Sequence, residues 1–190
     1  MNHIMQVDKK TTNVMISDAI SNPNFRKKND IKNQYNLSAD FYNNRYRNIQ
    51  YEKYSRMLNS MELKGMILDL GSGTGMLSEF LNKEIIGVDF SIKMLKKSGK
   101  YKILGDAENL PFKNDTFDIV LSFTLIQNLP NFGVFKEVRR ILKPNSLFIL
   151  TVLRKKYDET LCKELEKGFS ILKEADCGED IGFICRAKDK

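Results

Sequence analysis

An aspartate and three glycines stand close together at the end of a short apolar run. The stretch "ILDLGSGTG" covers residues 67–75, where Asp69 comes two residues before Gly71, and Gly73 and Gly75 follow at intervals of two. Glycine adopts backbone dihedrals that other residues avoid and lets a ligand approach the main chain closely. A glycine-rich turn after a strand is typical of sites for nucleotide-like ligands. This turn is therefore the first candidate binding site.

The aspartate in the turn restricts the kind of ligand. In the dinucleotide-binding fingerprint GxGxxG the third glycine would stand where this chain has Met76. A pyrophosphate would also meet the carboxylate of Asp69 with no lysine or arginine in the turn. Like charges about 4–5 Å apart in a partly desolvated site cost on the order of kilocalories. The phosphate-loop pattern GxxxxGK[ST] does not occur either, so the turn favours a ligand with a positive group.

Two more carboxylates end the next two apolar runs. Asp89 stands 18 residues after Gly71, where a carboxylate can accept hydrogen bonds from both hydroxyls of a ribose. Asp106 ends the following run, where it can accept from the exocyclic amine of an adenine. With Asp69 facing an ammonium group, the three carboxylates fit S-adenosylmethionine. Structural interpretations stay open: Asp69 and Asp106 as turn residues, and Asp89 as a helix cap, although Ser91 is better placed to cap.

Strand and helix patterns alternate around these carboxylates. Strands are predicted at residues 66–70, 84–90, 101–106, 117–123, 146–153, 169–175 and 181–188. Helices are predicted at residues 74–82, 92–99, 135–142 and 158–168. This alternation indicates a parallel sheet with helices on both faces, whereas the short turn before the last strand requires an antiparallel pair. The predicted fold class is α/β: a doubly wound, mostly parallel sheet with an antiparallel C-terminal hairpin.

The first third of the chain has a different character. Residues 1–33 are polar and contain an Asn-Pro pair, which predicts a mobile N-terminal arm with a short helical piece at 12–20. Aromatic and apolar residues then recur at helical spacing from 38 to about 60. We therefore expect one domain at 34–190 behind the arm.

The positive charge of the chain is also concentrated in this first third. Residues 1–65 hold 11 lysines and arginines and 6 acidic residues, which is +5 of the total formal charge of +7. An anionic partner such as RNA is one interpretation. A solvated, lysine-rich surface is the other, and it is favoured because the charges are scattered.

The histidine and cysteine content limits the chemistry. The single histidine is His3, so neither a histidine-assisted nucleophile nor a metal centre is expected, and any general base is Asp, Glu, Tyr or Lys. Cys162, Cys177 and Cys185 are odd in number and show no CxxC spacing, which favours reduced thiols. No apolar run approaches the roughly 20 residues of a membrane span, and the start lacks the apolar core of a signal peptide. A cytoplasmic protein is expected.

Four motifs in order give a resemblance to a known family. "ILDLGSGTG", "IIGVDFSIKML", "GDAENLPFKNDTFDIVLS" and "EVRRILKPNSLFILTVL" resemble the successive motifs of class I S-adenosylmethionine-dependent methyltransferases. The group that includes ubiquinone- and menaquinone-biosynthesis methyltransferases is the most similar, and the resemblance covers roughly residues 35–155. It implies a seven-stranded, Rossmann-like sheet with a terminal antiparallel hairpin, in agreement with the strand pattern.

The resemblance also implies roles for individual residues. The cofactor would be held by Asp69, Gly71, Ser72, Gly73, Gly75, Asp89, Phe90, Asp106, Ala107, Ser122 and Phe123. A lid or acceptor site would be formed by Tyr35, Tyr42, Tyr46, Gln127 and Asn128. Phe90, Phe123 and the tyrosines could equally be packing residues, and Gln127 and Asn128 could be loop residues. The catalytic residues stay unassigned.

The methyl acceptor stays open at this level. The stretch "SFTLIQNLPN" lacks the [ND]PP[YF] element of amide and base-amine methylation, and no cysteine stands near the fourth or fifth strand end for covalent pyrimidine methylation. A small metabolite is the favoured acceptor. The alternatives are tRNA or a translation-related protein, with a small activating subunit, and a cofactor-binding module without turnover. A nicotinamide-dependent oxidoreductase is disfavoured by the glycine spacing and by Asp69.

Overall fold

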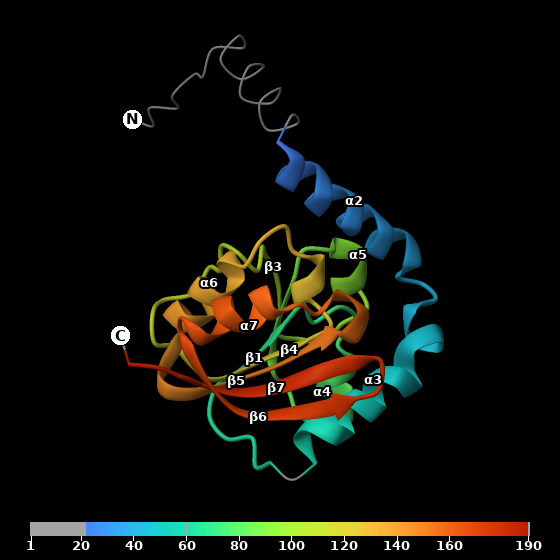
Figure 1. Cartoon of the computed structure of the whole chain (residues 1–190). Helices are drawn as coiled ribbons and strands as arrows, with labels where there is room; N and C mark the ends of the chain where they lie inside the picture. The colour runs from blue at the N-terminus through green and yellow to red at the C-terminus, as the bar shows by residue number, and fades with distance from the viewer. Residues whose placement is uncertain (1–21, 60, 190) are drawn as a thin grey trace, which may run out of the picture.

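The strands form one twisted sheet in the described part of the chain. A computed structural model describes residues 22–59 and 61–189, and Figure 1 shows its architecture. The strand order is β3-β2-β1-β4-β5-β7-β6. The strands are β1 (Ile67–Leu70), β2 (Ile86–Asp89), β3 (Lys102–Leu104), β4 (Phe117–Phe123), β5 (Leu142–Leu153), β6 (Phe169–Cys177) and β7 (Asp180–Ala187). The first five pair in parallel, and β7 pairs antiparallel with both β5 and β6. The predicted fold class is confirmed.

Helices cover both faces of this sheet (Figure 1). They are α2 (Pro23–Ser38), α3 (Tyr42–Leu58), α4 (Met76–Leu81), α5 (Ile92–Leu95), α6 (Gly133–Ile141) and α7 (Glu159–Glu166), with short 3₁₀ turns η1 (Ile126–Asn128) and η2 (Arg154–Lys156). Side chains of α6 and α7 pack in one apolar core, and those of α3 and α4 pack in a second core on the opposite face. Because both faces are covered, every residue of β1 is buried.

The register of the parallel strands brings the predicted carboxylates to one edge. Asp69 of β1 pairs with Gly87 of β2, and Asp89 pairs with Leu104 of β3. Parallel strands end on the same side of a sheet, so Asp69, Asp89 and the loop that begins at Gly105 lie at a common carboxyl-terminal edge.

The N-terminal segment differs from the expectation where the structure describes it. The helical piece expected at 12–20 lies outside the described residues. Residues 23–38 form the single helix α2, so the boundary expected between residues 33 and 34 falls inside a helix. The Asn-Pro pair is the reason: Asn22 caps α2 by accepting a hydrogen bond from the Asn24 amide at 2.9 Å, and Pro23 takes the first turn.

Two further properties belong to the described residues as a whole. None of their helices combines the length and the apolar character that crossing a bilayer requires. Cys162, Cys177 and Cys185 are all free thiols, and the latter two are buried.

Candidate functional site

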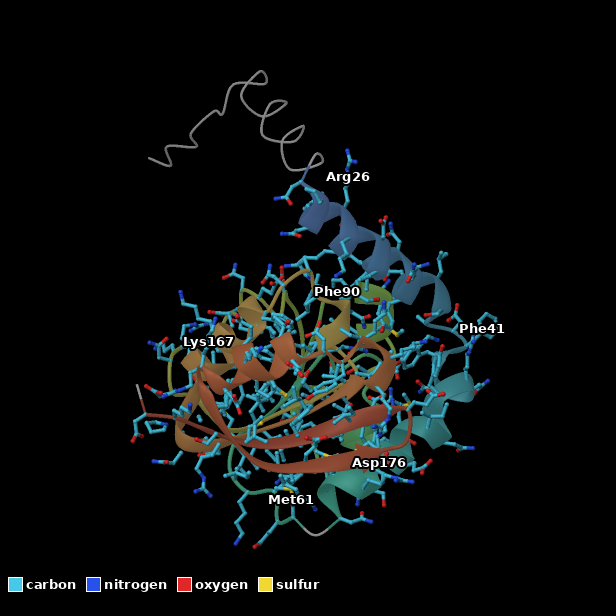
Figure 2. All side chains as sticks on the ribbon, in the orientation of Figure 1. Arg26, Phe41, Met61, Phe90, Lys167 and Asp176 are labelled. Atoms are coloured by element: carbon cyan, nitrogen blue, oxygen red, sulfur yellow. The ribbon has the colours of Figure 1, made fainter. Side chains whose placement is uncertain are left out.

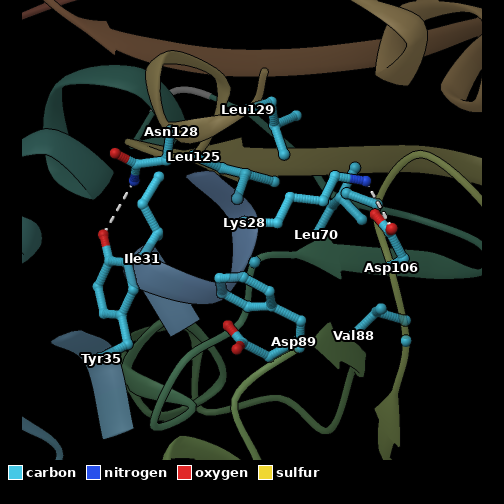
Figure 3. A pocket seen from close by; sticks show the side chains of 14 residues that line it. Lys28, Ile31, Tyr35, Leu70, Val88, Asp89, Asp106, Leu125, Asn128 and Leu129 are labelled. Carbon is cyan, nitrogen blue, oxygen red and sulfur yellow. Dashed lines mark hydrogen bonds and ion pairs between the residues drawn. The ribbon is translucent and has the colours of Figure 1, made fainter. Parts of the chain in front are cut away.

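A pocket with about 460 Å³ of empty volume, open space at its mouth included, lies at the carboxyl ends of β1, β2 and β3, beneath α2 (Figure 3). The residues that line it are Lys28, Ile31, Tyr35, Leu70, Gly71, Val88, Asp89, Phe90, Gly105, Asp106, Ala107, Leu125, Asn128 and Leu129. Apolar side chains form its walls, and carboxylates stand at two places on its rim. This combination suits a flat apolar group with a few polar attachments.

The glycine turn forms one wall of the pocket and is tied to β2. The amides of Gly71 and Ser72 both donate to the carbonyl oxygen of Val88, at 2.8 and 3.0 Å. Gly71, Gly73 and Gly75 have φ angles of 81°, 54° and 84°, in the left-handed region. Glycine is the residue that adopts this region without strain, so the spacing of the three glycines follows from the path of the turn.

Replacing Gly71 with alanine is expected to cost more stability than the same change at Gly73. A Cβ at Gly71 would stand 3.2 Å from the side chain of Leu125, whereas a Cβ at Gly73 would meet nothing within 4 Å. Both changes carry left-handed strain of about 1–2 kcal/mol, and overpacking adds roughly 1 kcal/mol or more at Gly71 alone. Urea denaturation of the two variants measures the difference. Equal losses would show that Leu125 moves aside freely.

Asp89 links the glycine turn to the start of α5. Its Oδ2 accepts from the Gly73 amide at 2.9 Å, and its Oδ1 accepts from the Ser91 amide at 2.8 Å. Ser91 Oγ caps α5 by accepting from the Met94 amide, so Asp89 is not that cap. Burial raises the pKa of Asp89, although hydrogen bonds from Ser91 and Gly73 act in the opposite direction. A carboxylate has about four acceptor positions, so Asp89 can still accept from a ligand in the pocket.

Asp69 lies behind the turn and not among the residues that line this pocket. It borders a neighbouring cavity together with Ser72 and Gly75. Burial, with a smaller contribution from the charge of Asp89, raises the pKa of Asp69 to about 8. A carboxyl group in this environment is largely protonated at neutral pH, and a nearby cation would favour its ionised form.

Asp106 is held by a lysine from α2. Lys28 Nζ lies 2.6 Å from Asp106 Oδ2 and 2.5 Å from Glu108 Oε2. Burial alone would lower the pKa of Lys28, but its hydrogen bonds to these two carboxylates raise it above its ordinary value. Asp106 Oδ1 accepts from the amide of Glu108 at 3.0 Å. The ion pairs therefore fasten α2 across the pocket, as Figure 3 shows for Lys28 and Asp106.

Replacing Lys28 with methionine is expected to loosen α2 without unfolding the domain. No residue of α2 is buried, so polar contacts such as this one hold the helix down. The partners are partly exposed, which limits the loss of global stability to about 1 kcal/mol or less. Hydrogen exchange should show several-fold faster exchange of the α2 amides. Lys32→Met on the same helix is the control, because Lys32 has no ion pair among the described residues; similar acceleration in both variants would contradict the role of Lys28.

The tyrosines predicted as a lid lie around a second cavity. This tyrosine cavity has about 1240 Å³ of empty volume, open space at its mouth included. It is lined by residues of α2, α3, the turn after β4, the end of β5, η2 and the turn before β7. Tyr35, Tyr42, Tyr46, Gln127 and Asn128 all line it. Figure 2 shows Phe41 at the outer corner where α2 meets α3, and Phe90 beneath α2.

Tyr35 and Asn128 also line the first pocket, so the two cavities adjoin. Asn128 Nδ2 donates to the hydroxyl of Tyr35 at 2.9 Å (Figure 3). The Tyr35 ring also meets Phe90 edge-on, with ring centroids 6.5 Å apart. Tyr35 and Asn128 therefore form the partition between the pocket at β1–β3 and the tyrosine cavity.

The remaining predicted residues lie outside the first pocket. Ser122 is fully buried, and Phe123 packs edge-on against Tyr54 with ring centroids 4.7 Å apart. Neither lines the pocket, nor do Ser72, Gly73 and Gly75, although the Gly73 amide binds Asp89. Sequence reasoning missed Lys28 and Ile31 of α2 and Leu125 and Leu129 after β4. The Asn-Pro helix start at 22–23 was the signal that could have revealed the first two.

The pocket fits the parts of S-adenosylmethionine that reach it. Leu70, Val88 and Leu129 supply apolar walls for an adenine, and the carboxylates of Asp89 and Asp106 supply acceptors for ribose hydroxyls and for the adenine amine. Gly71 borders this space as well. Together, the strand order and this pocket define a Rossmann-like methyltransferase fold.

Comparisons with known proteins agree with this fold assignment. Residues 68–150 match the family model described as a methyltransferase domain. An uncharacterized protein of Methanocaldococcus jannaschii is 35% identical over 150 residues, which are 75% of this chain and 59% of that protein. A demethylmenaquinone methyltransferase of Staphylococcus saprophyticus is 35% identical over 112 residues, 50% of this chain and 48% of that one. The chain thus spans about half of the length of these curated relatives.

A solved structure has the same fold. The chain solved in complex with the Trm112 methyltransferase activator of Haloferax volcanii superposes with a TM-score of 0.71 at 17% identity, over 82% of this chain and 98% of that one. In its motifs, in the methyltransferase domain matched at residues 68–150 and in its fold, the chain is similar to class I S-adenosylmethionine-dependent methyltransferases.

Proposed function

We propose that the protein transfers the methyl group of S-adenosylmethionine to a small metabolite bound in the tyrosine cavity. The observation that carries this proposal is the shared wall: Tyr35 and Asn128 border both the cofactor pocket and the tyrosine cavity. Two ligands that exchange a group must meet within a few ångströms, with water excluded. Adjoining cavities beneath two helices supply that arrangement.

The proposed cofactor contacts follow from the position of each side chain. Asp89 would accept from the ribose hydroxyls, while Asp106 and Ala107 would border the adenine, with Phe90 against it. The turn from Gly71 to Gly75, with Asp69 behind it, would receive the methionine end. The cofactor supplies an electrophilic methyl group, so the protein has to position the acceptor and keep water out.

A small acceptor is favoured over a nucleic acid because half of the cations of the first helices are engaged in ion pairs. Lys28, Arg47, Lys53 and Arg56 each form an ion pair with a carboxylate. Phosphate binding needs cations that are free to replace counterions along a backbone. Four of the eight lysines and arginines of α2 and α3 are therefore paired with carboxylates in the described part of the chain. We place this activity in the cytoplasm, in keeping with the free cysteines.

Calorimetry followed by a labelling experiment tests this proposal. Binding of S-adenosylmethionine in the micromolar range is expected, with no comparable binding of NAD. Radiolabelled methyl transfer to fractionated small-molecule, tRNA and protein pools should then place label in the small-molecule fraction. Tight binding of NAD alone would overturn the proposal. Cofactor binding without transfer to any pool would instead favour a binding module.

A second candidate is methylation of tRNA or a translation-related protein with an activating subunit. The open edge of the sheet at β3 favours it, because Leu104 and the adjoining Tyr101 are 56% and 48% exposed. An exposed edge strand offers backbone groups for pairing with another chain. The chain from Haloferax volcanii assembles with an activator, which motivates co-expression with a Trm112-type subunit. Label in the tRNA or protein pool, gained only with that subunit, would favour this candidate.

A further inference from the structure

The floor of the tyrosine cavity carries a buried lysine. Lys53 of α3 lines the cavity, and its side chain is 4% exposed. Its ammonium lies 2.9 Å from Asp180 Oδ1 and donates to Thr124 Oγ1 at 3.1 Å. Asp180 is fully buried and is not among the residues that line the cavity. The lysine of this ion pair, and not the aspartate, therefore borders the cavity.

A network of hydrogen bonds fixes the position of this ammonium. Asp180 Oδ2 accepts from the hydroxyls of Thr124 and Thr151, both at 2.8 Å. The carbonyl oxygen of Thr124 in turn accepts from Gln127 Nε2 at 2.8 Å. An ammonium has three donors, and Thr124 takes one of those of Lys53, while Asp180 Oδ1 pairs with its charge without a hydrogen bond. A donor is therefore left for a group in the cavity.

The cavity offers little to remove a proton from an acceptor. Among the residues that line it, Glu179 is the single carboxylate, and it is exposed at the mouth. Burial raises the pKa of Tyr42 and of Tyr35, so neither phenol ionises at neutral pH. The other charged residues that line it, Arg45 and Lys155, are cationic and exposed. A protonated amine would meet three cations against one carboxylate at the mouth.

The cavity also holds an unused acceptor atom. Oε1 of Gln127 is buried and has no hydrogen-bond partner in the described chain, and the same is true of Gln50 Oε1. The amide orientation of Gln127 is fixed, because Nε2 must face the Thr124 carbonyl, which can only accept. Buried acceptors without partners are rare in folded proteins and often mark a binding site.

Resting on the methyltransferase function proposed above, we propose that the acceptor is a small phenol that reacts as its anion, stabilised by the Lys53 ammonium. The tyrosine rings pack against the aromatic ring, and Gln127 accepts a hydrogen bond from a second polar group of the acceptor. An ammonium in contact with a phenolate lowers the pKa of the phenol, which replaces a general base.

The chemistry of this step balances without another reactant. The phenol releases its proton to bulk water through the open mouth. The phenolate oxygen then forms a bond to the methyl carbon, while the carbon–sulfur bond breaks and leaves its electron pair on sulfur. The products are a neutral methyl ether and a neutral thioether.

Titration of the full chain with 4-nitrophenol tests the proposal without any cofactor. The phenolate form of this dye absorbs visible light, so the apparent pKa of the bound dye can be read from its absorbance. We expect binding of the dye to lower its pKa by about one unit relative to the free dye, the low end of the range for an adjacent opposite charge. A bound dye with unchanged or raised pKa, or no binding at millimolar concentration, would overturn the proposal.

Two matched double variants test whether Lys53 causes the shift in the pKa of the bound dye. Lys53→Met with Asp180→Asn removes both buried charges, so no unpaired charge stays in the core, and the shift should disappear. Arg56→Met with Glu52→Gln removes an exposed pair from the same helix and should preserve it. If the first variant does not fold, the titration of the wild-type chain still decides. Buried Cys177 has a raised pKa, so its thiol is neutral and does not contribute to the shift.

An assay of methyl transfer distinguishes the proposed phenol acceptor from the methyltransferase function on which that proposal rests. With S-adenosylmethionine added, loss of the yellow colour should report formation of the methyl ether. Transfer to matched anilines but not to phenols, or to RNA alone, would reject the phenol acceptor and keep the methyltransferase. Absence of cofactor binding by calorimetry would reject the methyltransferase function itself.

Discussion

Asp89→Ala is expected to abolish measurable binding of S-adenosylmethionine while the domain stays folded. The side chain has two acceptor oxygens at the pocket, one already bound to Gly73 and the other to Ser91. Hydrogen bonds from two ribose hydroxyls to a carboxylate contribute about 1.5–3 kcal/mol each, so their loss lowers affinity about 100-fold or more. Calorimetry with the purified variant measures the change.

Two matched variants make this result specific. Asp89→Asn keeps one acceptor oxygen and should fall between wild type and alanine. Asp118→Asn removes a carboxylate at the other end of the sheet, where Asp118 holds Lys143 at 2.8 Å and accepts from the Met66 amide at 2.8 Å. That variant should bind the cofactor with wild-type affinity. An affinity of Asp89→Ala close to that of wild type would remove the ribose role from Asp89.

The sheet could be predicted because its strands have strong local signals. Apolar runs at 66–70 and 117–123 are bounded by Gly65 and by the "NDT" turn, and both coincide with strands of the structure, β1 and β4. The antiparallel hairpin followed from the short turn before Asp180. Helix lengths were less predictable: α4 begins at Met76 and not at Thr74, because Gly75 has a left-handed conformation that ends the turn first.

The position of α2 could not be predicted, because the helix has hardly any apolar pattern. It is mostly polar and buries no residue, so its place is set by single contacts with distant residues. Lys28 reaches Asp106 across 78 residues of sequence, and Tyr35 reaches Asn128 across 93. Periodicity carries no information about such contacts. Residues contributed by α2 were therefore missed or assigned to an arm.

The strand register explains why one of the three predicted carboxylates lines a different cavity from the other two. Asp69, Asp89 and Asp106 end neighbouring strands, and strand order places such ends side by side whatever the loops do. Asp69 pairs with Gly87, however, which stands two residues before Asp89, so Asp69 lies deeper along the strands than Asp89 and need not share its cavity. Asp89 and Asp106 line the cofactor pocket, whereas Asp69 lines the cavity behind the turn.

Asp69→Asn is expected to stabilise the cofactor-free protein increasingly as pH rises from 5 to 8. The pKa of Asp69 is about 8 in the folded chain, against about 3.9 in an unfolded one. Between these values the folded state keeps a proton that the unfolded state has lost. Ionisation therefore favours unfolding, and the free energy of unfolding of wild type falls by up to about 1.4 kcal/mol per pH unit. The loss is complete above the folded pKa.

Chemical denaturation of wild type and Asp69→Asn across this pH range isolates the effect, since the asparagine cannot ionise. The stability difference between the two proteins should widen steadily with pH. Asp118→Asn is the control of opposite sign: Lys143 lowers the pKa of Asp118, so that carboxylate is ionised throughout the range and its contribution should stay constant. A constant difference for Asp69→Asn as well would show that Asp69 is already ionised at pH 5.

The same carboxyl group should couple cofactor binding to pH. If the ammonium of the cofactor comes near Asp69, the ionised form becomes favoured, and binding at pH 7 releases up to about one proton. Calorimetry in buffers of different ionisation enthalpy counts that proton, and wild-type affinity should rise by up to about tenfold per unit towards pH 8. Asp69→Asn should bind the cofactor more weakly and release up to about one proton fewer. The difference in proton release between the two proteins reports Asp69 alone, because protons lost by the ligand itself are the same in both. Because Asp69 lies behind the glycine turn, equal proton release in both proteins would mean that the turn shields it from the ligand, and its role would then be confined to the fold.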